Sequence, residues 1–130
     1  MKNAWIVKLC MWREARGGGI QGMQSVLNVI VNRSHNDGLL PWQVVMQPDQ
    51  FSSMTYPGDI QADNYPGESD EAYMIATELV RQQDAGILQD ITKGALYYYA
   101  ESIEKVPSWA LGMEKTVVIG GQQFLKPKKV

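Results

Sequence analysis

Glu14 is the residue of this sequence whose neighbours most favour acid–base chemistry. It lies near the end of one helical pattern, and Gly17–Gly19 break that pattern before a long amphipathic stretch begins. Such a corner lets a carboxyl group face a cleft, with Trp12 as an aromatic neighbour and Arg16 available to orient the surroundings. A desolvated carboxyl group keeps its proton to higher pH, as a general acid working near neutrality must. We therefore predict that Glu14 is a proton donor, although an acid near a helix end is more commonly a solvated surface residue.

Cys10 and His35 are the only cysteine and histidine in the chain. A Cys/His peptidase needs the two side chains adjacent, with the cysteine reachable and in an electropositive place. Cys10 instead falls inside an apolar helical stretch, where a free cysteine behaves as a small hydrophobe, and His35 falls at a polar helix end. We expect neither to be catalytic. A zinc hydrolase would need an unusual ligand set, so we expect no metal ion and no other cofactor.

The composition is that of an ordinary globular protein. Of 130 residues, 45% are hydrophobic and 20% charged, and the length suits one domain spanning residues 1–130. A net charge of −2 provides no positive field for nucleic acid. No stretch approaches the ~20 apolar residues of a membrane span, and the N-terminus lacks the pattern of a signal peptide. We therefore expect a monomer that neither binds nucleic acid nor spans a membrane.

Helical periodicity positions Glu14 between two helices. The pattern predicts a first helix that ends at about Ala15, with Asn3 as its N-cap, and a second from about Gly19 to His35. The second helix is clearly amphipathic. Its polar face carries Gln21, Gln24, Ser25, Asn28 and Arg33.

Two further helices are expected after this pair. Pro41 suits the first turn of a short helix, and Ser69 or Asp70 would cap a long helix that ends near Gly86. Between them, residues 47–67 are rich in Pro, Gly, Asp, Ser and Asn. A stretch of this length without periodicity predicts a functional loop, or contains an element that the pattern does not reveal.

The C-terminal part predicts a small sheet. Ala95–Tyr99 is rich in strand-forming residues, and Thr116–Ile119 and Gln122–Leu125 flank two glycines as a hairpin would. We therefore predict an α+β fold, in which a mainly helical body carries a small antiparallel β-sheet near the C-terminus.

The tyrosines of the first expected strand divide between its two faces. Strand alternation places Leu96 and Tyr98 on one face and Tyr97 and Tyr99 on the other. The apolar Leu96 suggests that its face meets the core, so that Tyr97 and Tyr99 point into a cleft. Tyrosine rings and hydroxyls over a groove suit a sugar ligand, although an ordinary half-exposed sheet face would have the same pattern.

Several short motifs follow one another along nearly the whole chain, from about residue 8 to 125. They are Glu14-Ala15-Arg16-Gly17, Gly22, Val26 through Asn32-Arg33, Gln50-Phe51-Ser52, Gly94-Ala95 with Tyr98, Pro107-Ser108-Trp109-Ala110, and Ile119-Gly120 with Phe124. Each is weak alone, but in this order they are specific. With them the sequence resembles the SleB/CwlJ-type cell wall hydrolases, known from spore-cortex lysis and from phage and bacterial lytic proteins.

The resemblance implies a lysozyme-like fold that cleaves peptidoglycan glycan strands between N-acetylmuramic acid and N-acetylglucosamine. The family's catalytic glutamate belongs to its Glu-Ala-Arg-Gly motif and falls on Glu14, the residue already favoured on chemical grounds. We assign substrate binding to residues of the Gln-Phe-Ser motif and of the tyrosine strand. These are Gln50, Phe51, Ser52, Tyr97 and Tyr99.

The type of cleavage stays open between two reactions. Hydrolysing glycosidases pair the general acid with a second carboxylate, and Asp49, Asp59 and Asp63 form no convincing partner motif. A lytic transglycosylase has less need of a second carboxylate, and we favour this reaction. The alternatives are a muramidase-type hydrolase and a non-catalytic peptidoglycan-binding or structural module. We expect synthesis in the cytoplasm without a signal peptide and action on the cell wall, as for a phage lysin released at lysis.

Overall fold

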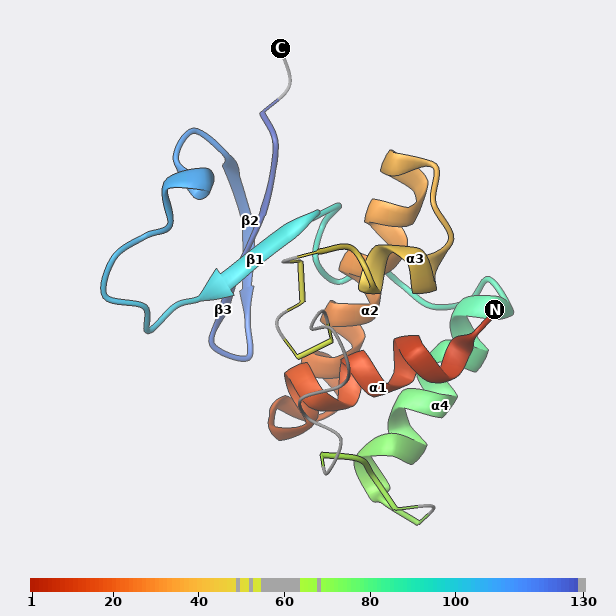
Figure 1. The fold of residues 1–130 in the computed structure, drawn as a ribbon. Helices are drawn as coiled ribbons and strands as arrows, with labels where there is room; N and C mark the ends of the chain where they lie inside the picture. Colours follow the sequence, from red (N-terminus) through yellow and green to blue (C-terminus); the bar gives the residue numbers. More distant parts are fainter. Residues whose placement is uncertain (49, 52, 55–63, 68, 129–130) are drawn as a thin grey trace.

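The chain folds into a helical body with a small sheet beside it (Figure 1). The computed structural model describes residues 1–48, 50, 51, 53, 54, 64–67 and 69–128. Their elements, in chain order, are α1 (Ala4–Ala15), the 3-10 helix η1 (Arg16–Gly18), α2 (Gly19–Asp37), α3 (Pro41–Val45), α4 (Glu71–Asp84), β1 (Tyr97–Ala100), the 3-10 helix η2 (Ser108–Ala110), β2 (Glu114–Ile119) and β3 (Gln122–Lys126). This is the α+β fold that the sequence predicts, with its sheet near the C-terminus.

Helix α2 is the central element of the helical body. It contacts α1, α3 and α4, and it also reaches β2 of the sheet. Its apolar residues Met23, Leu27 and Ile30 are fully buried in the main core, because their spacing places them on the side that faces the other helices. Although α2 is the longest helix, none of the helices in the described part of the chain is long and apolar enough to cross a membrane.

Glycine backbone makes the corner between α1 and α2. Gly19 has a φ of 69°, in the left-handed region that glycine adopts without steric cost. A Cβ on Gly22 would lie 3.5 Å from the carbonyl oxygen of Ala15, so the end of α1 lies close against the start of α2. This close approach fixes the direction of the last turn of α1, which carries Glu14.

The sheet is antiparallel, with β3 between β1 and β2. Gly120 and Gly121, at φ 56° and 78°, form the two-residue turn of the β2–β3 hairpin, as the sequence predicts. This turn lies against α2, since a Cβ on Gly120 would be 4.0 Å from the Cα of Gly22. Tyr98 of β1 packs on Phe124 of β3 with ring centroids 5.3 Å apart, and this pair joins the sheet to the helices.

Two details of the sequence prediction are wrong. Asn3 precedes α1, but its side chain makes no capping hydrogen bond, because its backbone is left-handed at φ 51°. Strand β1 begins at Tyr97 rather than at Ala95. The cause is a turn just before it, in which the Asp90 carboxylate accepts a hydrogen bond from the backbone N–H of Gly94 at 2.9 Å.

Candidate active site

Glu14 lies on the last turn of α1, and its carboxyl group is partly buried. Ser53 donates a hydrogen bond from its Oγ to Glu14 Oε1 at 3.2 Å. Within the described residues no basic side chain forms an ion pair with Glu14. Burial raises the pKa of the Glu14 carboxyl above its ordinary value, and the Ser53 hydrogen bond offsets part of that rise. Glu14 therefore keeps its proton to higher pH than a solvated glutamate does.

Two cavities share Glu14 as a wall residue. The larger has a volume of about 650 Å³ and the smaller of about 230 Å³, and Tyr98 also contributes to both walls. The larger volume is typical of a ligand pocket, for which roughly 300–1,000 Å³ is usual. Because Glu14 lines both spaces, the arrangement suits a ligand that extends from one cavity into the other past this residue.

Aromatic side chains form one wall of the larger cavity. Tyr97 and Tyr99 of β1 both contact Trp109 of η2, with ring centroids 5.8 and 6.3 Å from the indole. Tyr98 packs against both core clusters, as strand alternation predicts, but Leu96, which the sequence predicts to meet the core on the same face, belongs to neither cluster and lines the larger cavity. Such a wall offers flat apolar surfaces together with hydroxyl groups, which suits the faces and the polar rim of a sugar ring.

Most of the predicted site residues come together at this larger cavity. Glu14, Gln50, Phe51, Tyr97 and Tyr99 all line it. Among the described residues of its wall, Glu14 is the only carboxylic acid. Four residues named in the sequence prediction lie outside the described residues: Ser52, Asp49, Asp59 and Asp63.

The smaller cavity is bounded mainly by backbone. Gly17, Gly18, Gly22 and Gly120 contribute to its wall beside Glu14. A Cβ added at Gly17 or Gly18 would meet no other atom within 4 Å, so the wall is open at these two glycines. The corner between α1 and α2 thus forms part of a cavity that Glu14 also lines.

Arg33 is a cavity residue that the sequence pattern places only on the polar face of a helix. Helix α2 carries it into the wall of the larger cavity, where it is 6% exposed. Its Nη2 donates hydrogen bonds to the side-chain oxygens of Gln47 and Gln50 at 2.9 and 2.7 Å. Burial lowers the pKa of the Arg33 guanidinium below its ordinary value. The Asn32-Arg33 pair of the family motif could have pointed to this residue. Helical periodicity alone does not distinguish the pair from the solvated end of a helix.

Trp12 and Arg16 do not surround Glu14 as the sequence predicts. The Trp12 indole donates a hydrogen bond from Nε1 to Asp70 Oδ1 at 3.0 Å, and the Arg16 guanidinium stacks on the same indole at 3.8 Å. Neither residue lines the two cavities that Glu14 borders. The indole is drawn to the carboxylate that caps α4, and Tyr98 takes its place as the aromatic neighbour of Glu14.

Cys10 and His35 are not placed as a peptidase would need them. Cys10 is fully buried in the main core, and burial raises the pKa of its thiol well above the ordinary value. His35 is exposed on the last turn of α2. In the part of the chain that the structure describes, no group of three His, Cys, Asp or Glu side chains could hold a metal ion.

Comparison with known proteins gives the class to which this fold and site belong. The sequence matches the Cell Wall Hydrolase family over residues 17–125, and the chain belongs to this family. The match begins at Gly17, just after Glu14. It confirms the resemblance found in the motifs. No curated protein matches the sequence at a significant level.

Two solved structures have a similar fold. One is the catalytic domain of the germination-specific lytic transglycosylase SleB from Bacillus anthracis, with a TM-score of 0.71 and 22% identity over 97% of this chain and 96% of that one. The other is the catalytic domain of the Bacillus cereus SleB protein, with a TM-score of 0.68 and 21% identity over 95% and 88% of the two chains. At these identities the likeness establishes the fold alone.

Proposed function

We propose that the protein cleaves peptidoglycan glycan strands between N-acetylmuramic acid and N-acetylglucosamine, as a lytic transglycosylase with Glu14 as its catalytic group. The observation that carries the proposal is the partly buried carboxyl group of Glu14, which has a raised pKa and no ion pair among the described residues, on a residue that lines two cavities. Membership of the Cell Wall Hydrolase family supports the substrate class. Similarity to a SleB domain named as a lytic transglycosylase supports the reaction class.

In the first step, protonated Glu14 donates its proton to the oxygen that bridges the two sugars. The bond from this oxygen to C1 of the muramic acid breaks, and the N-acetylglucosamine leaves with a hydroxyl group. Because Ser53 donates to Oε1, Oε2 is the oxygen left free to carry and release the proton. This is general acid catalysis, for which a carboxyl group that stays protonated near neutral pH is required.

In the second step, the Glu14 carboxylate accepts the proton of the muramic acid 6-hydroxyl. The oxygen of that hydroxyl bonds to C1 and closes a 1,6-anhydro ring. Glu14 is protonated again at the end, so one residue serves as acid and then as base. No water is consumed.

Hydrolysis is the alternative reaction, in line with the name of the family. A hydrolysing glycosidase uses a second carboxylate, at roughly 5–5.5 Å from the acid for a nucleophile or 6.5–9.5 Å for a base that activates water. Glu14 is the only acid among the described residues of the larger cavity wall. This supports attack by the substrate's own hydroxyl over attack by water.

Substrate binding in this proposal takes place mainly in the larger cavity. Tyr97 and Tyr99, backed by Trp109, present ring faces to the sugars, and Gln50 and Phe51 form the facing part of the wall. Ser52 keeps the role that the family motif suggests. The protein would act as a monomer on the wall, which it would reach at lysis as a phage lysin does.

Mass spectrometry of peptidoglycan digested with the purified protein tests the reaction class. Fragments that end in 1,6-anhydromuramic acid, lighter by one water than hydrolysis products, are expected. Hydrated reducing ends would instead assign the chain to the muramidases. Binding to cell walls without release of either product would identify a non-catalytic module and refute the proposal.

A further inference from the structure

The buried guanidinium of Arg33 forms no ion pair with any of the described residues. The residue is 6% exposed, yet no carboxylate among the described residues forms an ion pair with it. Buried charges are ordinarily paired, because removing an ion from water is costly unless an opposite charge or several hydrogen bonds compensate. Among the described residues, hydrogen bonds and aromatic rings surround this charge, but no ion pair compensates it.

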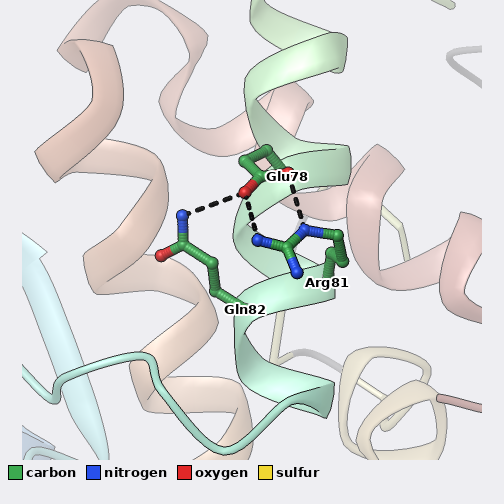
Figure 2. A network of polar contacts seen from close by, with 3 residues as sticks. All are labelled: Glu78, Arg81 and Gln82. Atoms are coloured by element: carbon green, nitrogen blue, oxygen red, sulfur yellow. Dashed lines mark hydrogen bonds and ion pairs between the residues drawn. The ribbon is translucent and has the colours of Figure 1, made fainter.

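Arg81 on α4 shows the usual arrangement for comparison. In Figure 2 its guanidinium faces the carboxylate of Glu78, and both carboxylate oxygens accept hydrogen bonds, at 2.9 Å from Nε and 2.7 Å from Nη2. Both side chains are exposed, so water could solvate either charge alone. The exposed arginine thus has a carboxylate partner, whereas the buried one has none in the part of the chain that the structure describes.

The contacts of Arg33 fix its position but use only part of its hydrogen-bonding capacity. Nη2 donates to the neutral side-chain oxygens of Gln47 and Gln50. The ring centroids of Phe51 and Tyr97 lie 5.7 and 5.3 Å from Cζ, within the distance of a cation–π contact. Nε is enclosed without a partner, and Nη1 donates to none of the described residues.

Arg33 also gives the larger cavity a charge opposite to that of the whole chain. Among the described residues of the wall, Arg33 is the one cation and Glu14 the one acid. Arg33 therefore places a positive group in this wall, although the chain has a net charge of −2. A cation that lines a cleft attracts an anionic group of a ligand.

We propose that Arg33 binds a carboxylate of the substrate, carried by the muramic acid residue or by the peptide attached to it. The inference rests on the proposed function, since that function places a glycan in the cavity. Muramic acid differs from N-acetylglucosamine by a lactyl ether, which ends in a free carboxylate or in an amide bond to a peptide. A guanidinium group matches a carboxylate in charge and in the direction of its N–H groups. Arg33 then selects strands that carry an acidic group beside the bond to be cut.

Binding to defined glycans tests this role in a protein that does not cleave them. The full chain with Glu14→Gln serves as the background, and Arg33→Met removes the buried charge while keeping an apolar stem of similar length. Arg81→Met is the matched control, because it removes the same charge from the exposed surface of α4. Isothermal titration calorimetry measures each protein against a chito-oligosaccharide, a peptide-free muramic acid strand, and strands with acidic or fully amidated peptides.

The expected result is tighter binding of carboxylate-bearing strands than of the chito-oligosaccharide, and this preference should depend on Arg33 and not on Arg81. The carboxylate-bearing strands should bind about tenfold more tightly than the chito-oligosaccharide, as a charge-assisted hydrogen bond provides. Arg33→Met should abolish this preference by weakening the carboxylate-bearing strands more than the chito-oligosaccharide, whereas Arg81→Met should keep it. A preference for the peptide-free strand identifies the lactyl carboxylate as the partner, and a preference confined to acidic peptides identifies a peptide carboxylate.

Two results would overturn the inference. One is a preference that survives Arg33→Met, and the other is an equal loss of affinity for charged and neutral glycans, which would make Arg33 a structural residue. Arg33→Lys provides a second variant if Arg33→Met does not fold; it should keep only part of the preference, because the charge remains and the fork of donors is lost. Failure of the wild-type chain to release fragments from cell walls would overturn the proposed function instead, and this is a separate measurement.

Discussion

Replacing Glu14 by glutamine should make the protein more stable at neutral pH while it removes the proposed acid. Burial raises the pKa of the Glu14 carboxyl in the folded protein above its unfolded value, so folding favours the protonated form. The stability that this group contributes is fully present below the unfolded pKa and is lost as pH rises through the folded pKa. Glutamine has nearly the same shape and no charge, so the variant does not undergo this loss.

The size of the effect follows from the contacts of Glu14. The side chain has no ion pair among the described residues, and its hydrogen bond from Ser53 can be accepted by the amide oxygen of glutamine. Below the pKa of an unfolded glutamate, about 4.3, the two proteins should therefore differ by no more than about 0.5 kcal/mol. Above it, the glutamine variant should gain about 1.4 kcal/mol for each unit by which the folded pKa exceeds the unfolded one.

Urea denaturation at a series of pH values measures this difference in free energy of unfolding. Glu101→Gln is the control, because it makes the same substitution at an exposed side chain and should change the free energy of unfolding by at most about 0.5 kcal/mol at neutral pH. A flat difference for Glu14→Gln would refute the reasoning, since it would mean that the carboxyl group is as well solvated in the folded protein as in the unfolded one. A Glu14→Gln protein less stable at neutral pH would show that the carboxylate makes a stabilising contact.

Three further results are expected. Ser53→Ala removes the hydrogen bond that lowers the pKa of Glu14, so the alkaline limb of the pH–rate profile should move to higher pH; an unmoved limb would contradict the assignment of Glu14 as the acid. Phe124→Ala should lower the free energy of unfolding by about 3–5 kcal/mol, because Phe124 is fully buried. Val118 lies on the same hairpin and is 47% exposed, so Val118→Ala should lower it by at most about 0.5 kcal/mol. Equal losses in urea denaturation would argue against the packing described. In native buffer, iodoacetamide should leave Cys10 unmodified and activity unchanged, whereas in denaturant it should alkylate the thiol. Mass spectrometry measures the modification, and rapid alkylation of the native protein would contradict the burial of Cys10.

The helices and the hairpin could be predicted because their signals are local. The apolar spacing of residues 19–35, the capping Asp70 and the Gly120-Gly121 turn each determine backbone structure within a few residues. The errors arose where a neighbouring contact decided the outcome. The turn held by Asp90 delays the start of β1, and a left-handed backbone at Asn3 prevents the expected cap.

The site was only partly predictable, because its members come from distant segments. Glu14 and the alternation of the tyrosines could be predicted from local pattern, and the family motif pointed to Gln50 and Phe51. Periodicity could not show that Arg33 is buried, since that depends on residues 47, 50, 51 and 97 closing around it. Nor could it show that Trp12 turns to the cap of α4 and away from Glu14.

Release of soluble fragments from purified peptidoglycan by the wild-type and Glu14→Gln proteins, at equal concentration and with matching circular dichroism spectra, tests the central claim most directly. General acid catalysis contributes roughly 10²–10⁴-fold to a rate, so the glutamine variant should be slower by at least about a hundredfold while it still binds the wall. A folded Glu14→Gln protein that releases fragments as fast as the wild type would contradict the account, because the proton would then come from another group.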